Sequence, residues 1–295
     1  MKPTLGEKAF NIINNIFMLV MCVVMIYPFL NQLAISFNEG SDTALGGINL
    51  LPRKFTLQNY QVVFENESFS SAAFISVTRV VLVVILSTIV VFSAAYGITR
   101  KGLAYRRGIT VFLMIPAYVT AGVIPTYMAY RYLGMINNYS VYIVPMLFSF
   151  YNMVIIRSFL QDLPASIEES AKIDGANDII IMAKIAFPLS MPVVATTALW
   201  VAVGAWNDWT TTLMYVTEPD LFPLQYLMMK LIKESEVAQQ MAAQATMTGK
   251  SSAFVPTSES VKAATLIVTT LPIILVYPFL QKYFIKGVTL GAVKE

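Results

Sequence analysis

The sequence predicts an all-α membrane protein with six transmembrane helices. Of its 295 residues, 57% are hydrophobic and only 13% are charged, whereas a soluble domain carries about 25% charged residues. A helix needs about 20 residues to cross a hydrocarbon core of about 30 Å, and six stretches with almost no charge reach that length. A charge at the centre of a span costs about 2.5–3.5 kcal/mol on insertion scales, so the scarcity of charge indicates membrane insertion.

The spans are expected to form a single membrane domain over residues 1–295. They are placed at about 10–37, 73–99, 108–131, 139–159, 187–215 and 262–284. The apolar core of the first is too long for a secretory signal peptide, so we interpret it as a retained helix. A weak cleavage-site pattern at Ala34-Ile35-Ser36 leaves cleavage as the alternative. Pro116 and Gly122 predict a kink in the third span. Arg79, just inside the second, is expected to snorkel to the outer interface.

Positive charge gives the expected orientation. The short connection between the second and third spans carries four cations, Arg100, Lys101, Arg106 and Arg107. Connections rich in Lys and Arg face the cytoplasm. Counting spans from there also places both termini and the connection at 160–187 in the cytoplasm.

The connection at 160–187 is predicted to be a capped helical elbow. Ser166 is a good N-cap, and Glu169, three residues later, completes a capping box. Gly175 supplies the positive φ that ends the first helix, and either Asn177 or Asp178 can cap the second. A folded elbow between two spans indicates that a partner docks there, although a cytoplasmic loop without a partner carries the same signals.

The elbow resembles the EAA loop of ABC-importer permeases. The resemblance is carried by Glu169-Ser170-Ala171, then Asp174-Gly175-Ala176, then Pro188-Leu189. Ser170 replaces the usual Ala, which is a mild departure. The tail at 286–294 is similar to the Lys-Gly-Leu-Thr-x-Gly-Ala-Val-Lys ending of the carbohydrate-uptake permeases, and the chain resembles the oligosaccharide branch of that group.

This resemblance implies a type I ABC importer permease fold with a cytoplasmic coupling helix, in the inner membrane of a bacterium. The chain would be the non-catalytic permease subunit of an ATP-driven, binding-protein-dependent oligosaccharide importer. It would bind no cofactor or metal itself, while two ATPase subunits bind ATP and Mg²⁺. The other implied partners are a second permease in a heterodimer, an extracellular solute-binding protein, the oligosaccharide and membrane lipid, but no nucleic acid. The residues implied to couple the chain to the ATPase are Glu168, Glu169, Ser170, Ala171, Asp174, Gly175 and Ala176.

Candidate residues for the sugar pathway follow from chemistry, because aromatic faces and amides suit hydroxylated rings. The candidates are Asn137, Asn152, Trp206, Asn207 and Trp209. Two tryptophans near the end of a span are also typical of an interfacial aromatic belt. Both interpretations remain open for Trp206 and Trp209.

Two other function classes were weighed. A secondary, ion-coupled transporter is the alternative, but such transporters carry ionisable residues at mid-membrane, and the spans hold almost none. A membrane enzyme lacks support because the chain has no histidine and only one cysteine, Cys22. Gly249-Lys250-Ser251 is not a nucleotide-binding loop, because position 244, where that motif requires glycine, is Gln.

Overall fold

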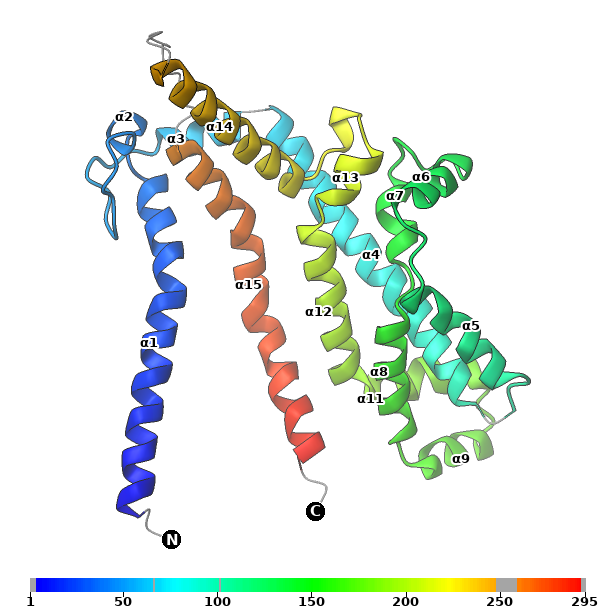
Figure 1. Ribbon diagram of the computed structural model, residues 1–295. Helices are drawn as coiled ribbons and strands as arrows, with labels where there is room; N and C mark the ends of the chain where they lie inside the picture. The colour runs from blue at the N-terminus through cyan, green and yellow to red at the C-terminus, as the bar shows by residue number, and fades with distance from the viewer. Residues whose placement is uncertain (1–3, 66, 101, 248–258, 293–295) are drawn as a thin grey trace. The chain divides into compact units, whose positions relative to one another are not determined.

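In the computed structural model, the described residues 4–65, 67–100, 102–247 and 259–292 are almost entirely helical (Figure 1). Within these ranges, the one pairing of extended backbone is an isolated bridge between Asn38 and Phe55. The predicted all-α class is therefore confirmed. Gly249-Lys250-Ser251 and the last residues of the 286–294 tail lie outside the described residues.

The chain divides into two compact units. Unit 1 consists of Met1–Phe69 and Met228–Leu271, and unit 2 of Ser70–Leu227 and Pro272–Glu295. The single membrane domain expected over the whole chain stays a prediction.

Unit 1 contains the long apolar helix that begins the chain. Its helices are α1 (Leu5–Ser36), α2 (Gly40–Thr43), α3 (Gln58–Glu65), most of α14 (Leu224–Met247) and the first part of α15 (Glu259–Ala292). A capping box starts α1: the Thr4 hydroxyl accepts from the Glu7 N–H, and the Glu7 carboxylate accepts from the Thr4 N–H at 2.7 Å. A small buried cluster joins the end of α1 to α15; it consists of Ala34, Ile35, Ile48 and Ala263.

Unit 2 holds the middle of the chain. Its helices are α4 (Glu67–Thr99, from Ser70 on), α5 (Arg106–Tyr118), α6 (Val123–Tyr132), α7 (Ser140–Ile143), α8 (Phe150–Gln161), α9 (Ala165–Ile173), α10 (Asp178–Ile181), α11 (Phe187–Leu189), α12 (Met191–Asn207) and α13 (Thr210–Tyr215), with the first residues of α14 and the part of α15 from Pro272 on. Short turns complete it: the 3₁₀ turns η1 (Val144–Met146) and η3 (Pro219–Leu221), and the π-helical turn η2 (Met182–Ala186).

Among the described residues, three helices are long and apolar enough to cross a membrane: Gly6–Ser36, Ser68–Thr99 and Glu259–Val276. Three further candidates are pairs bent at a short break, by 116° between α5 and α6, by 44° between η1 and α8, and by 82° between α11 and α12. Counted as one span each, the pairs bring the number to six. The largest bend agrees with the predicted kink, because Gly122 takes a φ of +83° there.

The core of unit 2 joins the elbow to the spans. Its buried members are Val91, Phe92, Ala95, Tyr96 and Ile98 of α4, Met153, Ile156 and Leu160 of α8, Ala171 of α9, Ile181 of α10, Ala186 of η2 and Val194 of α12. Phe92 meets Phe187 edge to face, with ring centroids 5.1 Å apart. The elbow helices therefore share one core with α4, α8 and α12.

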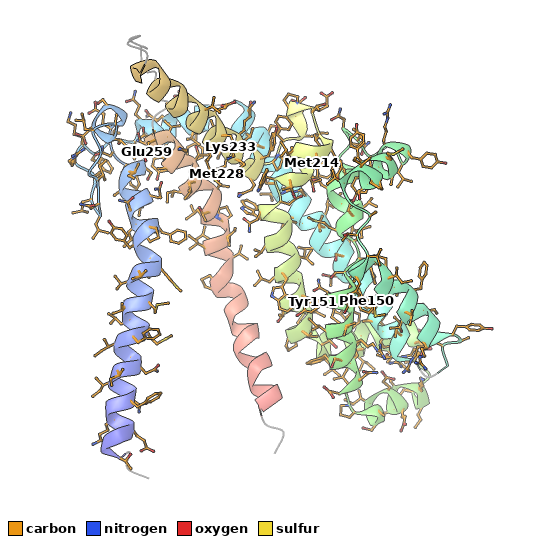
Figure 2. The ribbon with its side chains drawn as sticks, viewed as in Figure 1. Phe150, Tyr151, Met214, Met228, Lys233 and Glu259 are labelled. Atoms are coloured by element: carbon orange, nitrogen blue, oxygen red, sulfur yellow. The ribbon has the colours of Figure 1, made fainter. Side chains whose placement is uncertain are left out.

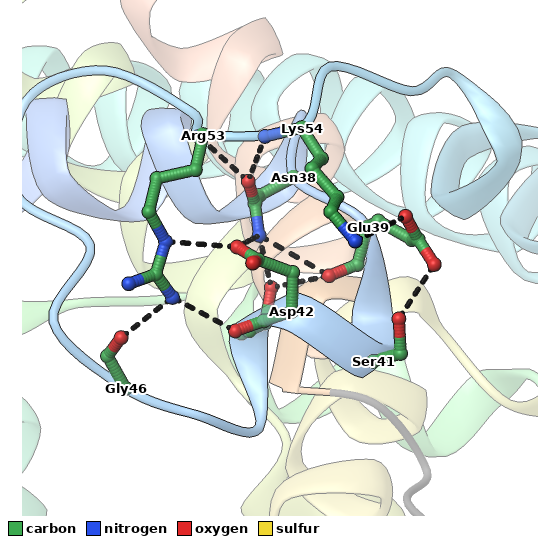
Figure 3. A network of polar contacts seen from close by, with 8 residues as sticks. Asn38, Glu39, Ser41, Asp42, Gly46, Arg53 and Lys54 are labelled. Carbon is green, nitrogen blue, oxygen red and sulfur yellow. Dashed lines mark hydrogen bonds and ion pairs between the residues drawn. The ribbon is translucent and has the colours of Figure 1, made fainter.

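Asn38 organises the connection between α1 and α3 (Figure 3). Its side chain is fully buried, and its carbonyl oxygen accepts from the backbone N–H groups of Arg53 and Lys54, each at 2.8 Å. Its amide donates to the carboxylate of Asp42 at 3.0 Å, and Arg53 Nε donates to the same oxygen at 2.9 Å. The hydrogen bond from Asn38 holds the pKa of Asp42 below its ordinary value.

We expect Asn38→Ala to loosen this connection, because the N–H groups of Arg53 and Lys54 would lose their acceptor. Leaving polar groups without partners costs about 1 kcal/mol or more for each buried group. The measurement is the rate of tryptic cleavage after Arg53 and Lys54 in the purified protein. Asn49→Ala is the control, because the Asn49 side chain is exposed; equal cleavage of both variants would contradict the role of Asn38.

Candidate functional site

The elbow at 160–187 forms, but its first helix starts differently from the prediction. Pro164 occupies the N-cap position of α9, and no side chain caps this end. The predicted capping box between Ser166 and Glu169 is therefore wrong, since Ser166 lies inside the first turn. Proline suits a helix start because its missing N–H would have no partner there.

The turn between α9 and α10 forms as predicted. Gly175 has a φ of +83°, its N–H donates to the carbonyl of Lys172, and the N–H of Ala176 donates to that of Ala171. This pair of bonds is a Schellman motif, which satisfies carbonyls at the end of a helix. Asn177 then caps α10 by accepting from the Ile180 N–H at 2.9 Å. Of the predicted coupling residues in this turn, Asp174 and Gly175 are exposed and Ala176 is half-buried.

Arg100, which follows α4, holds Glu168 of α9. Two guanidinium nitrogens lie 2.5 and 2.6 Å from the two carboxylate oxygens, so the pair is bidentate. The guanidinium also lies 4.0 Å from the centroid of the Tyr96 ring. Hydrogen bonding from Arg100 lowers the pKa of Glu168, which keeps this carboxylate ionised. We call Arg100 and Glu168 the clasp.

The two sides of α9 differ chemically. On one side, Ala171 is buried in the core and Glu168 is held in the clasp. On the other, Glu169 and Ser170 are exposed, and Ile173 is 87% exposed. We call Glu169, Ser170 and Ile173 the outer face of α9.

Sequence reasoning missed Ile173. The available signal was an apolar residue directly before the Asp174-Gly175 stop of an otherwise polar helix. Ile179 on α10 is also exposed, by 71%. Two exposed isoleucines on one short elbow indicate a contact surface, because soluble surfaces rarely gather apolar side chains without a partner.

A polar cavity of about 670 Å³ lies beside the clasp. It is lined by Gly97, Thr99, Arg100, Gly102, Leu103, Ala165, Glu168, Glu169, Lys172 and Asp178. Within the described part of the chain, no three His, Cys, Asp or Glu side chains are grouped so that they could hold a metal ion. The charged side chains of this lining offer hydrogen bonds and ion pairs.

Two of the predicted pathway residues have partners or neighbours within the chain. Asn137 takes a φ of +53° and hydrogen-bonds Thr217: its carbonyl oxygen accepts from the Thr217 N–H at 2.6 Å, and its amide lies 2.9 Å from the Thr217 hydroxyl. Asn152 is 6% exposed and lines a small polar cavity together with Ser87 and Thr197.

The other three predicted pathway residues lie around the end of α12. Trp206 is 8% exposed and lines an apolar cavity of about 220 Å³. Asn207 is exposed, and Trp209 is half-buried. The five candidates therefore occupy several different surroundings.

Arg79 is buried, so the expectation that it snorkels to the interface is wrong. Its side chain is 1% exposed, and Nη2 donates to the carbonyls of Ala205 and, at 3.0 Å, of Asp208. Nη1 lies 3.8 Å from the carboxylate of Asp208, and the guanidinium lies 5.0 Å from the centroid of the Tyr142 ring. The cation thus caps the end of α12.

Asp208 connects this contact to α13. Its second carboxylate oxygen accepts from the Thr210 hydroxyl at 2.9 Å and from the Thr211 N–H at 3.1 Å. The hydroxyl of Tyr142 bonds Thr212 of α13 and the carbonyl of Leu221, each at 2.9 Å. Arg79 and its partners therefore fix the break between α12 and α13.

We expect Arg79→Gln to destabilise the protein by about 3–5 kcal/mol, because removal of one partner leaves the other charge buried and unpaired. The measurement is the unfolding midpoint in denaturant or heat. Arg131→Gln, which removes an exposed cation on α6, should leave the midpoint unchanged. Equal stability of the two variants would show that the Arg79 contact contributes nothing.

The clasp predicts a pH-dependent stability. Because the folded-state pKa of Glu168 is lowered, the contribution is fully present above the ordinary value of 4.5 and is lost as pH falls through the lowered value. Glu168→Gln should therefore unfold more easily at neutral pH, by about 1 kcal/mol or less for a partly exposed pair. The difference from wild type should disappear in acid. Glu169→Gln, the exposed neighbour, is the control; a difference that persists in acid would contradict the charge-based origin.

The family described as "Binding-protein-dependent transport system inner membrane component" matches residues 91–290. Two relatives from Bacillus subtilis (strain 168) align along nearly the whole chain. "Polygalacturonan/rhamnogalacturonan transport system permease protein YtcP" is 32% identical and covers 98% of this chain and 99% of its own length. "Protein LplC" is 34% identical and covers 100% of this chain and 98% of its own length.

A solved structure shows the same fold. It is a chain of a bacterial ABC transporter "involved in the import of the acidic polysaccharide alginate", with a TM-score of 0.85 and 26% sequence identity. The alignment covers 96% of this chain and 99% of that chain.

Proposed function

Because the chain belongs to the family of binding-protein-dependent transport system inner membrane components, we propose that it is the permease subunit of an ATP-driven oligosaccharide importer. The names of its relatives support a saccharide as the substrate, since one is a polygalacturonan/rhamnogalacturonan permease and another belongs to an alginate importer. The family description places the chain in the inner membrane, and its several candidate spans make it a multi-pass protein. This membership argues against the secondary, ion-coupled transporter.

The main support for a role of α9 in coupling the chain to an ATPase is Ile173. This side chain is 87% exposed, although the opposite side of the helix is buried in the core. An ATPase subunit with an apolar groove would bury Ile173 and leave Glu169 as a polar anchor beside it. In this proposal Asp174 and Gly175 shape the turn. ATP and Mg²⁺ bind to the two ATPase subunits, and this chain carries no catalytic residue.

The clasp and the shared core would transmit a movement of α9 to the membrane spans. A displacement of α9 acts on α4 through Arg100 and Glu168, and on α8 and α12 through the shared core. Packed cores move as rigid bodies between discrete arrangements and do not deform continuously. The elbow would therefore shift the spans of unit 2 together, which is what alternating access requires.

The proposed orientation places the elbow and both termini in the cytoplasm. Arg100, Arg106 and Arg107 lie between α4 and the first turn of α5, and such clusters are retained on the cytoplasmic side. The proposed partners are a second, different permease, two ATPase subunits and an extracellular solute-binding protein.

The experiment is a pull-down of the tagged chain from gently solubilised source membranes, with mass spectrometry of the co-purified chains. We expect an ATPase, a second permease and a solute-binding protein. Ile173→Ser should lose the ATPase while it keeps the second permease. Ile124→Ser removes a similarly exposed isoleucine on α6 and should keep both. Recovery of the wild-type chain alone, still folded, would overturn the proposed function.

Gly175→Arg should abolish transport without preventing membrane insertion. The φ of +83° is strained for any residue with a Cβ, and the side chain would project from the proposed ATPase contact. Gly134→Arg is the matched control, because Gly134 has a φ of +67° and equally open surroundings away from the elbow. Uptake and membrane yield are measured together; wild-type uptake by a normally expressed Gly175→Arg chain would rule out the coupling role.

A further inference from the structure

An exposed pair of aromatic rings lies where a membrane span is broken. The span formed by α7, η1 and α8 bends by 44° at residues 147–149, and Tyr151 stands in the first turn of α8. Its neighbour Phe150 packs against the core of unit 2, while Tyr151 is 66% exposed (Figure 2). Irregular backbone at membrane depth is tolerated only against protein or a water-filled cavity, so this break indicates one of the two.

The second ring comes from α12. Trp200 is 44% exposed, and its ring is stacked with that of Tyr151, with centroids 6.0 Å apart and an interplanar angle of 29°. Trp200 stands near the middle of Met191–Asn207, roughly 10 Å from either end at 1.5 Å per residue. An aromatic belt occupies the ends of spans, so this position is not explained by one.

Both rings carry polar groups that have no partner among the described residues. Neither the Tyr151 hydroxyl nor the Trp200 indole N–H makes a hydrogen bond to this part of the chain. Leaving such groups in hydrocarbon is costly, because lipid tails offer no hydrogen bonds. We therefore expect the exposed edges of these rings to face water or a polar molecule, and not lipid tails.

The side of α12 that carries Trp200 continues with Gly204 and Asn207. Residues four and seven positions apart share one side of a helix, and all three are exposed. A Cβ at Gly204 would meet nothing within 4 Å, so there is open space between the indole and the Asn207 amide. We call Tyr151, Trp200, Gly204 and Asn207 the aromatic shelf.

We propose that the aromatic shelf is the surface on which this subunit contacts a pyranose ring of the transported oligosaccharide. The C–H face of the sugar would stack on the two aromatic rings, and its hydroxyls would bond the phenol, the indole N–H and the Asn207 amide. The open space at Gly204 admits the ring close to the α12 backbone. This inference rests on the proposed function, because it identifies the substrate contact of that same importer.

The nearby apolar cavity fits a sugar less well. Its lining from α4, α12 and α15 is entirely apolar, and it includes Val77, Leu199, Val203 and Trp206. Sugar hydroxyls placed there would have no partner, which is unfavourable. Trp206, predicted as a pathway residue, faces this apolar cavity, whereas Asn207 lies on the shelf; the pathway role of Trp206 stays a prediction.

The first test asks whether the shelf faces water in the assembled importer. Cys22 is the only cysteine of this chain, so Cys22→Ser leaves the chain without thiols, and labelling is read on this chain after the subunits are separated. In the purified complex in lipid nanodiscs, Gly204→Cys should react with a charged, membrane-impermeant thiol reagent at least about tenfold faster than Phe112→Cys, which is 72% exposed on α5. A Gly204→Cys thiol as unreactive as that of Phe112→Cys would place lipid or a partner helix on the shelf and overturn the proposal.

The second test measures uptake of oligosaccharides made by partial hydrolysis of polygalacturonan and rhamnogalacturonan into proteoliposomes. Trp200→Ala should lower uptake by about tenfold, while Trp200→Phe keeps most of it. Tyr132→Ala, which removes a 91% exposed ring on α6, is the control. Loss of uptake with the normal yield of co-purified ATPase supports the shelf; loss of the ATPase together with uptake would indicate a structural role and overturn it.

The two proposals fail separately. If the wild-type complex contains the ATPase and Trp200→Ala takes up sugar normally, the shelf is wrong and the importer stands. If no partner co-purifies with the wild-type chain, the importer proposal fails before either test of the shelf is made, because both tests use the assembled complex.

Discussion

The packing of unit 2 depends on one buried cation, Arg79. Arg79 is 1% exposed and belongs to a span, so its charge must be balanced by the protein. It is balanced by the end of α12, where two backbone carbonyls and the carboxylate of Asp208 converge. Because Asp208 also accepts hydrogen bonds from the start of α13, and the guanidinium itself lies over the Tyr142 ring, a single side chain sets where several helices meet. These contacts consequently fix the relative orientation of α12 and α13 at the break between them.

A second ion pair between distant residues lies near the elbow, and it differs from the Arg79 contact in its exposure. The clasp between Arg100 and Glu168 is partly exposed, so it positions α9 more than it stabilises the fold. Apolar burial of Ala171 and Ile181 supplies the stability. The clasp and the buried residues lie on one side of α9, so the outer face has no internal partners among the described residues. A surface that binds another protein must be free in this way.

Local features were predictable from the sequence, and contacts between distant residues were not. Gly175 and Asn177 act on backbone within a few residues, so their roles follow from residue type alone. Arg100 and Glu168 are separated by 68 positions, and Arg79 and Asp208 by 129, so no periodicity or spacing connects them. Ser166 failed as a cap because Pro164, an equally local signal, competed for the same helix start. Among the pathway candidates, residue type could not tell which side of α12 each tryptophan occupies.

The distance in sequence between Arg79 and its partners also has a consequence for biosynthesis. Ala205 and Asp208 leave the ribosome 126 and 129 residues after Arg79. At about 5–20 residues per second, that delay is on the order of ten seconds. During this interval α4 enters the bilayer with an uncompensated guanidinium, whose long side chain can reach the headgroups. The contact between α4 and the end of α12 can therefore form only after α12 has been synthesised, so unit 2 cannot complete its packing before that point.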